Sequence, residues 1–128
     1  MNKNLSHSND ALQSMQEPLA TIENLILTIR GKQVMLDRDL ARLYGVETKV
    51  LNQAVKRNIE RFPDRFMFQL TDNEMVKLVT ICDRFKLLKH SSSLPYAFTE
   101  HGVTMLASVL KSEIAVQISI KIVDAFVT

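Results

Sequence analysis

This chain of 128 residues has few of the features that mark secreted or membrane proteins. Its one cysteine, Cys82, has no partner for an internal disulfide, which favours a reducing, cytoplasmic compartment. No apolar run reaches the roughly 18 residues that a transmembrane helix needs. The first residues also lack the apolar core of a secretory signal. We therefore expect one cytoplasmic domain without a membrane partner.

The residues that carry catalysis or bind metals are also sparse. There are three glycines, and no Gly-rich phosphate loop, nucleophile elbow or pair of catalytic carboxylates occurs. His7, His90 and His101 are far apart, and with one cysteine they give no metal-ligand spacing. Glu100 and His101 with Asp83 are the best acid–base candidates, but nothing in the sequence brings them together. We expect no enzyme, no cofactor and no metal site.

Aromatic residues are scarce as well, with no tryptophan and two tyrosines. This leaves little material for stacking the bases of a single strand. Tyr44 falls at an inner helical position, and Phe62, Phe66 and Phe68 form a cluster. We expect all four side chains to lie in the core.

The positive charge is concentrated in one part of the chain. The net charge is only +2, yet residues 30–61 hold eight basic and four acidic side chains, an excess of +4. Residues 1–29 carry −2, and residues 62–128 are balanced. A local basic excess is typical of a DNA-binding surface, although a solvated helical face has the same composition.

The basic stretch has the pattern of a helix-turn-helix from Asp37 to Asn58. Two helices that cross steeply need a small side chain at their contact, and Ala41 supplies it. The turn needs a residue that tolerates positive φ, and Gly45 supplies that four residues later. The apolar positions around them are Leu40, Tyr44, Val46, Leu51 and Ala54.

The second helix of this motif carries side-chain types that bind phosphates and base edges. Its outward face carries Lys49, Asn52, Gln53 and Lys56, whose i, i+3, i+4, i+7 spacing places them on one side of the helix. A helix face of this kind can lie along a major groove. An ordinary helical hairpin that serves as scaffold is the alternative. The candidate DNA-binding residues are Arg42, Thr48, Lys49, Asn52, Gln53, Lys56, Arg57 and Arg61, with Arg57 and Arg61 directed to flanking phosphates.

The remaining pattern predicts an α+β fold. We expect residues 1–20 to be a disordered or frayed lead before a domain at 21–128. Residues 25–36 predict two short strands around a Gly31–Lys32 turn, and Asp37 or Asp39 is expected to cap the next helix. In the middle of the chain we expect a helix from about Glu47 to Glu60 before Pro63, a strand at Arg65–Leu70, and a helix from a Thr71 capping box to about Ile81. An aperiodic loop is expected at Arg84–Ser93, followed by a strand at Tyr96–Phe98. The last two elements expected are a helix from Thr99 to about Leu110 and a helix from Ser112 to about Val127.

The expected last helix is apolar on more than one face, so we expect it to be buried or to meet a partner. It can pack in the core, form a homodimer or bind a repressor protein, and a strand over residues 118–122 is a minor alternative. The chain ends at this helix, and we expect a longer protein. The two apolar sets are Ile114, Ile118, Ile122, Ala125 and Phe126, and Val116, Ile120, Val123 and Val127.

Three motifs in a fixed order resemble a known family. They read IRGKQVMLDRDLARLYGVETKVLNQAVKRNIERFPDRFMFQLT, then LPYAFTEHGVTMLASVL, then IKIVDAFV. From about Ile29 to Val127 the chain is similar to the KilA-N-like DNA-binding domain named after the N-terminal part of a phage ORF-six protein. That group is related to the KilA-N and Bro-N domains of phages and large DNA viruses.

The resemblance implies a small α+β unit with a helix-turn-helix-like part, at the N-terminus of a bacterial prophage or mobile-element protein. It implies double-stranded DNA as partner and an antirepressor-like role in transcription regulation, often with a second domain downstream. One departure is the segment before LPYAFTE, which reads DRFKLLKHSSS and lacks the family's glycines. The alternative function is a protein-interaction module without DNA contact.

Overall fold

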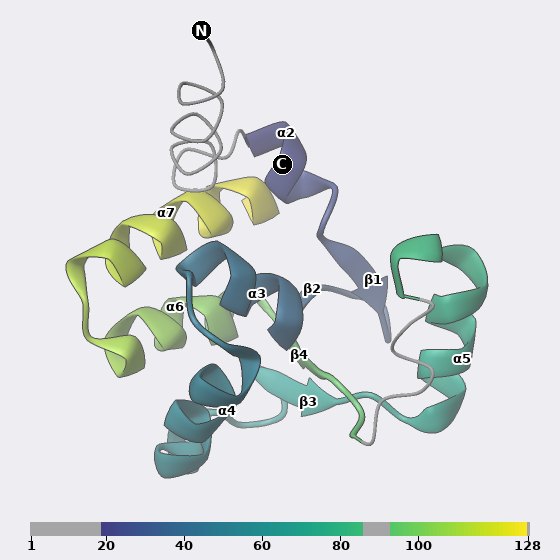
Figure 1. Ribbon diagram of the computed structural model, residues 1–128, viewed down its shortest axis with the longest axis horizontal. Helices are drawn as coiled ribbons and strands as arrows, with labels where there is room; N and C mark the ends of the chain where they lie inside the picture. Colours follow the sequence, from purple (N-terminus) through teal and green to yellow (C-terminus); the bar gives the residue numbers. More distant parts are fainter. Residues whose placement is uncertain (1–18, 86–92, 128) are drawn as a thin grey trace, which may run out of the picture.

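Four short antiparallel strands form the centre of the fold, in the order β1-β2-β4-β3 (Figure 1). The structure is a computed structural model that describes residues 19–85 and 93–127. Met35 and Met67 both pair with Phe98, so the late strand β4 joins two segments that are distant in sequence. The strands are β1 at Leu27–Ile29, β2 at Lys32–Leu36, β3 at Met67–Gln69 and β4 at Tyr96–Phe98.

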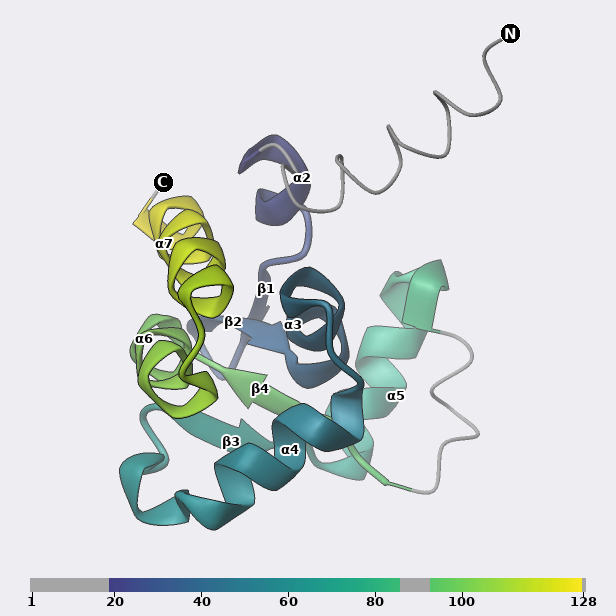
Figure 2. The ribbon, with the colours of Figure 1, turned by 60° about the vertical axis from the view of Figure 1, so that its left-hand side comes forward.

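Helices cover both faces of this sheet, as expected for an α+β fold. Each helix that the sequence predicts after the β1–β2 hairpin is present in the described part of the chain (Figures 1 and 2). The expected lead lies outside the described residues up to position 18, while Leu19 and Ala20 begin a helix. The helical segments are α2 at Leu19–Glu23, α3 at Asp37–Tyr44, α4 at Thr48–Arg57, η1 at Ile59–Arg61, α5 at Asp72–Ile81, α6 at Glu100–Leu110 and α7 at Glu113–Val127.

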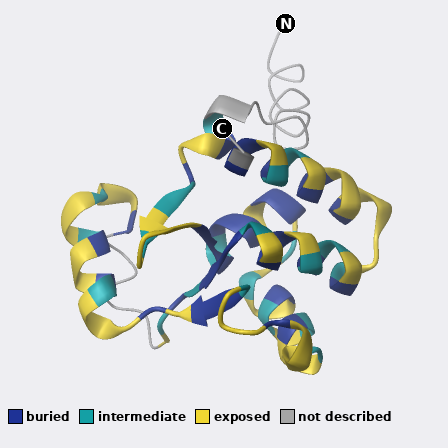
Figure 3. Ribbon diagram, turned by 180° about the vertical axis from the view of Figure 1, so that it is seen from behind, coloured by how far each residue is buried: buried dark blue, intermediate teal, exposed yellow. Residues whose placement is uncertain are grey.

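Alternation along the strands divides the core into two clusters. Val34 and Leu36 of β2 pack on one face with residues of α5, and Met35 between them packs on the other face. That second face carries α3, α4, α6 and α7, whereas α5 and Phe85 pack on the first. The end of β2 and most of β3 and β4 are buried between these layers, whereas β1 and the start of β2 are partly exposed and the helices expose their outer faces (Figure 3). Phe62 and Phe68 are buried as expected, whereas Phe66 is half-buried.

Side-chain caps fix three helix starts where the sequence predicts them. Thr71 and Glu74 form the capping box of α5, and the Thr99 hydroxyl accepts a bond from the Gly102 amide at the start of α6. The Ser112 hydroxyl accepts a bond from the Ala115 amide at the start of α7. Residues 118–122 are helical, so the strand alternative is wrong.

The hairpin turn lies one residue earlier than expected. Arg30 and Gly31, with φ of 57° and 73°, form the two-residue loop, and Lys32 pairs with Ile29. A positive φ is unfavourable for arginine, but the Arg30 guanidinium donates two bonds to Glu74, at 2.8 and 3.0 Å, and stacks on Phe68. This ion pair lowers the pKa of Glu74 to about 2 and ties the hairpin to α5. The turn therefore has a contact with a residue that is distant in sequence.

The predicted cap of α3 is also wrong. Leu36 occupies the N-cap position without a side-chain bond, and the helix begins at Asp37 itself. Asp37 and Asp39 are buried beneath the first turn, with 5% and 4% of their surface exposed. Both carboxylates are held by residues distant in sequence.

Candidate nucleic-acid interface

The turn between α3 and α4 is closed by a Schellman motif. Gly45 has a φ of 74°, its amide bonds to the Arg42 carbonyl, and the Val46 amide bonds to the Ala41 carbonyl. Glu47, in extended conformation, is the N-cap residue that precedes α4. The predicted positive φ at Gly45 is confirmed, and the three-residue connection fixes how the two helices meet (Figure 2).

The inner faces of both helices pack in the larger core cluster. Ala41 is 1% exposed, and Leu51 and Val55 of α4 are buried in the same cluster. Tyr44 is buried as expected, and its hydroxyl lies 2.6 Å from the Ser119 hydroxyl of α7. Burial raises the pKa of Tyr44 to about 12. The motif is therefore anchored to α7 and the sheet.

The backbone at Gly45 gives a first testable prediction. A Cβ there meets nothing within 4 Å, so a substitution is penalised through φ alone. Gly45→Val should lower the free energy of unfolding by about 1–2 kcal/mol, because a β-branched residue is strained at positive φ. Gly45→Asn is the matched control, since asparagine tolerates this region. Urea melts in which both variants are equally stable would contradict the prediction.

The carboxylate of Asp37 joins the two helices of the motif to the sheet. Its Oδ2 accepts bonds from the Asn52 side-chain amide at 2.9 Å and from the Tyr96 backbone amide at 3.3 Å. Its Oδ1 accepts the Arg38 amide at 2.8 Å. One buried group thus connects α3, α4 and β4, and holds α4 at a fixed position.

Two opposing effects act on the ionisation of Asp37. Burial raises the pKa of its carboxyl above the usual range, whereas the bonds from Asn52, Tyr96 and Arg38 lower it. Burial is the larger effect, so the folded state binds the proton more tightly than the unfolded state. Stability from this group is present below the ordinary carboxyl pKa and is lost as the pH rises through the raised one.

A second buried carboxylate ties the motif to the segment after α5. Both oxygens of Asp39 accept bonds from the Arg84 guanidinium, at 2.9 and 3.0 Å. The same guanidinium lies 3.9 Å from the centre of the Phe85 ring. The sequence predicts a loop from Arg84 to Ser93, but Arg84 and Phe85 lie in a 3-10 turn, and residues 86–92 are outside the described residues.

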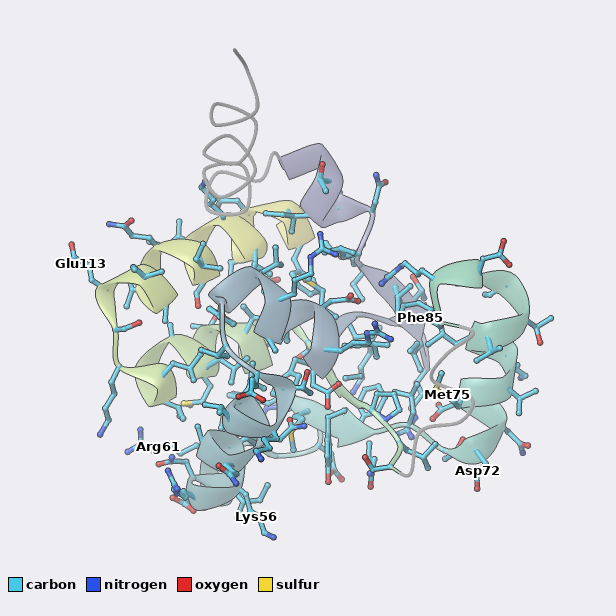
Figure 4. The ribbon with its side chains drawn as sticks, viewed as in Figure 1. Lys56, Arg61, Asp72, Met75, Phe85 and Glu113 are labelled. Atoms are coloured by element: carbon cyan, nitrogen blue, oxygen red, sulfur yellow. The ribbon has the colours of Figure 1, made fainter. Side chains whose placement is uncertain are left out.

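The outward face of α4 carries Lys49, Gln53 and Lys56 at i, i+4 and i+7. All three are exposed, and no hydrogen bond or ion pair joins their side chains to any other residue that the structure describes. Lys49 and Lys56 lie about 10 Å apart along the helix axis. Lys56 points away from the body of the domain, as does Arg61 of η1 (Figure 4). The face therefore offers cations and an amide to a partner.

The other predicted site residues lie around this face. Arg57 and Arg61 are exposed at its C-terminal end, and Arg42 is exposed on α3. Thr48 is half-buried at the start of α4. Asn52 is on the same helix, but its amide nitrogen is bound to Asp37. The structure thus places Lys49, Lys56, Arg57 and Arg61 on α4 and at its C-terminal end, leaves Arg42 on α3 outside this row, and gives Asn52 an internal contact.

Two hollows flank α4 and share Asn52 and Tyr96 in their walls. The larger, of about 610 Å³, lies over the buried carboxylates Asp37 and Asp39, near Arg84. The smaller, of about 380 Å³, is a groove whose rim is Lys49, Gln53 and Lys56. We call it the α4 groove, and its remaining lining is Asn52, Val55, Ile59, Met67 and Tyr96.

Sequence reasoning missed the residues that reach this surface from other elements. The sequence predicts strands at Met67 and Tyr96 and a longer helix through Ile59, and it places none of the three on a DNA-binding surface. That helix ends at Arg57, and a 3-10 turn exposes 53% of Ile59 beside the groove. The FPDRFMFQLT and LPYAFTE segments were visible as motifs, but their approach to α4 depends on the pairing of β3 with β4.

Two classes of feature are absent within residues 19–85 and 93–127. No cluster of histidine, cysteine and carboxylate side chains there is arranged to hold a metal ion. None of the helices in the same ranges is long and apolar enough to cross a membrane.

Comparison with known proteins gives one kind of match. The model of a family described as the ORF6N domain matches residues 24–109. The matched range starts before β1, ends in the last turn of α6, and contains the whole α3–α4 unit. No curated protein and no solved structure matches the chain.

Proposed function

We propose, from the premise that this chain belongs to the ORF6N domain family, a KilA-N/Bro-N-like phage domain, that it binds double-stranded DNA through α4. The observation that carries the proposal is the exposed row of Lys49, Gln53 and Lys56 on a helix whose inner face is held by the core and by the Asn52–Asp37 hydrogen bond. Its role is then regulatory, in a protein of the antirepressor type. We assign the chain binding and no catalysis.

Preorganisation supports this role. Asp37 fixes α4 through Asn52, and Leu51 and Val55 anchor its inner face. The lysines therefore need no rearrangement of the backbone before they meet phosphates, and only side-chain freedom is lost. Arg57 and Arg61 extend the positive surface beyond the end of the helix. An α-helix of this kind fits the width of the major groove.

The salt dependence of binding tests the proposal directly. If four to six phosphates are contacted, log K for a random duplex should fall by roughly 4 to 5 for each tenfold rise in salt. Fluorescence anisotropy at several salt concentrations measures this slope. Binding that is absent at low salt, or independent of salt, would contradict DNA contact.

A pair of substitutions distinguishes base recognition from electrostatic contact with the phosphates. Gln53→Ala should weaken binding to a selected site by about 1–3 kcal/mol and leave random DNA almost unchanged, because a glutamine amide suits the edge of adenine. Arg57→Ala should weaken both and reduce the salt slope by about one unit. The site comes from selection in a randomised duplex pool. A site preference that survives Gln53→Ala would show that α4 does not read bases through this residue.

A specific observation also favours a second candidate function, association through α7. Ile114, Val116 and Ile120 expose 53%, 44% and 57% of their surfaces, while the other side of α7 is buried in the core. A second copy of the chain or a repressor protein are the partners expected from the sequence. Light scattering after size exclusion distinguishes them, because a homodimer forms without any added protein.

A further inference from the structure

The α4 groove has a feature that phosphate contact does not use, its apolar floor. Val55 and Met67 close the bottom, and Ile59 and Tyr96 form exposed or half-exposed walls. These four residues come from α4, η1, β3 and β4, so the groove is produced by the tertiary fold. A large exposed isoleucine beside buried apolar residues is a surface suited to an apolar ligand group.

The charge around the groove restricts the ligand. Its rim carries Lys49 and Lys56, and no acidic residue is among its lining residues. The larger hollow next to it, in contrast, lies over Asp37 and Asp39. The α4 groove therefore favours a ligand that presents apolar groups between negative charges.

The major groove of DNA presents that combination. Thymine projects its C5-methyl group into the major groove, between the phosphates of the two strands. Gln53 on the rim has the amide that suits adenine, the partner of thymine in each pair. An adenine contact by Gln53 would bring a neighbouring thymine methyl to the side of α4 on which Ile59 and Tyr96 lie.

We propose that the α4 groove receives thymine methyl groups, so that the domain prefers duplexes rich in A·T pairs. This inference rests on the proposed DNA-binding function and adds to it a chemical basis for base preference. Ile59 and Tyr96 cover the methyl, Gln53 contacts adenine, and the two lysines hold the phosphates on either side. Burial of one methyl group corresponds to about a fourfold gain in affinity.

Deoxyuridine tests the inference, because it differs from thymidine only by the absence of this methyl group. The probes are short duplexes of alternating adenine and thymine, and the same duplexes with uracil in place of thymine. The thymine duplex should bind about fourfold tighter or more at equal salt. In duplexes of alternating guanine and cytosine, 5-methylcytosine should increase affinity, since its methyl group occupies the same position.

Ile59→Ala should reduce the ratio between the affinities for thymine and uracil duplexes toward one, because the thymine methyl loses the side chain that covers it. Val76→Ala, at a similarly exposed apolar position on α5, is the matched control and should keep the ratio. Circular dichroism confirms that both variants are folded. Equal binding of thymine and uracil duplexes would overturn the inference and leave DNA binding intact. Failure of both duplexes to bind at low salt would overturn the proposed function as well, and would leave the groove to an acidic protein segment.

Discussion

Replacing Gly102 with alanine should reduce the free energy of unfolding by about 3 kcal/mol or more. Helix propensity alone predicts the opposite, a gain of about 1 kcal/mol, because Gly102 lies inside α6. A Cβ at this position, however, would overlap the backbone carbonyl oxygen of Phe66 and lie 3.3 Å from the Phe98 ring. The carbonyl cannot move freely, since it also accepts the backbone amide of Thr99 at 3.0 Å.

The contact at Gly102 joins the start of α6 to the segment that leads into β3. The Thr99 hydroxyl donates to the Arg65 carbonyl at 2.7 Å in the same junction, so alanine must separate two hydrogen-bonded segments. Thermal and urea melts measure the loss. Thr104→Ala, at an exposed position on the same helix, is the control and should change stability by less than about 0.5 kcal/mol. Equal stability of Gly102→Ala and the parent chain would mean that α6 does not approach Phe66 this closely.

Asn52→Asp should destabilise the fold by about 3 kcal/mol near neutral pH. The new carboxylate would face the Asp37 carboxylate, from which the amide nitrogen of Asn52 is now 2.9 Å away. Two like charges in a partly buried site raise the pKa of one of them strongly. The folded state of the variant then binds an extra proton, so the penalty is present at neutral pH and decreases as the pH falls through the raised pKa.

Urea melts at about pH 7 and about pH 4 test this prediction. Gln53→Glu introduces the same change from amide to carboxylate one residue later, on the exposed face, and should cost little stability at either pH. Asn52→Ala should cost about 1–3 kcal/mol, because it leaves the buried Asp37 with one donor fewer. If Asn52→Asp is as stable as Gln53→Glu at neutral pH, Asp37 does not hold α4 through this residue.

These variants also separate two roles for Asn52. The sequence predicts a residue that contacts adenine, and the structure shows its amide bound to Asp37. A residue that positions α4 should affect specific and random DNA alike when replaced by alanine. A residue that reads bases should affect the selected site alone. The contrast with Gln53→Ala in the same assay distinguishes these roles.

The sequence alone determined the elements whose causes are local. The capping box at Thr71 specifies the start of α5, and Gly45 specifies the turn of the motif, because each effect acts within a few residues. The basic excess on residues 30–61 and the spacing of Lys49, Gln53 and Lys56 likewise depend only on order along the chain. The α+β class and the family followed from such patterns.

Tertiary structure alone decided what depends on contacts across the chain. The pairing of Ile29 with Lys32 places the hairpin turn at Arg30–Gly31, one residue from its predicted position, and there Arg30 contacts Glu74 of α5. The two candidate caps Asp37 and Asp39 are instead buried acceptors for Asn52 and Arg84, donors that lie 15 and 45 residues away in the sequence. The α4 groove arises in the same way, since β3 and β4 must pair before Met67 and Tyr96 can meet α4. Local patterns carry no information about such distances, and only the folded chain brings these residues together.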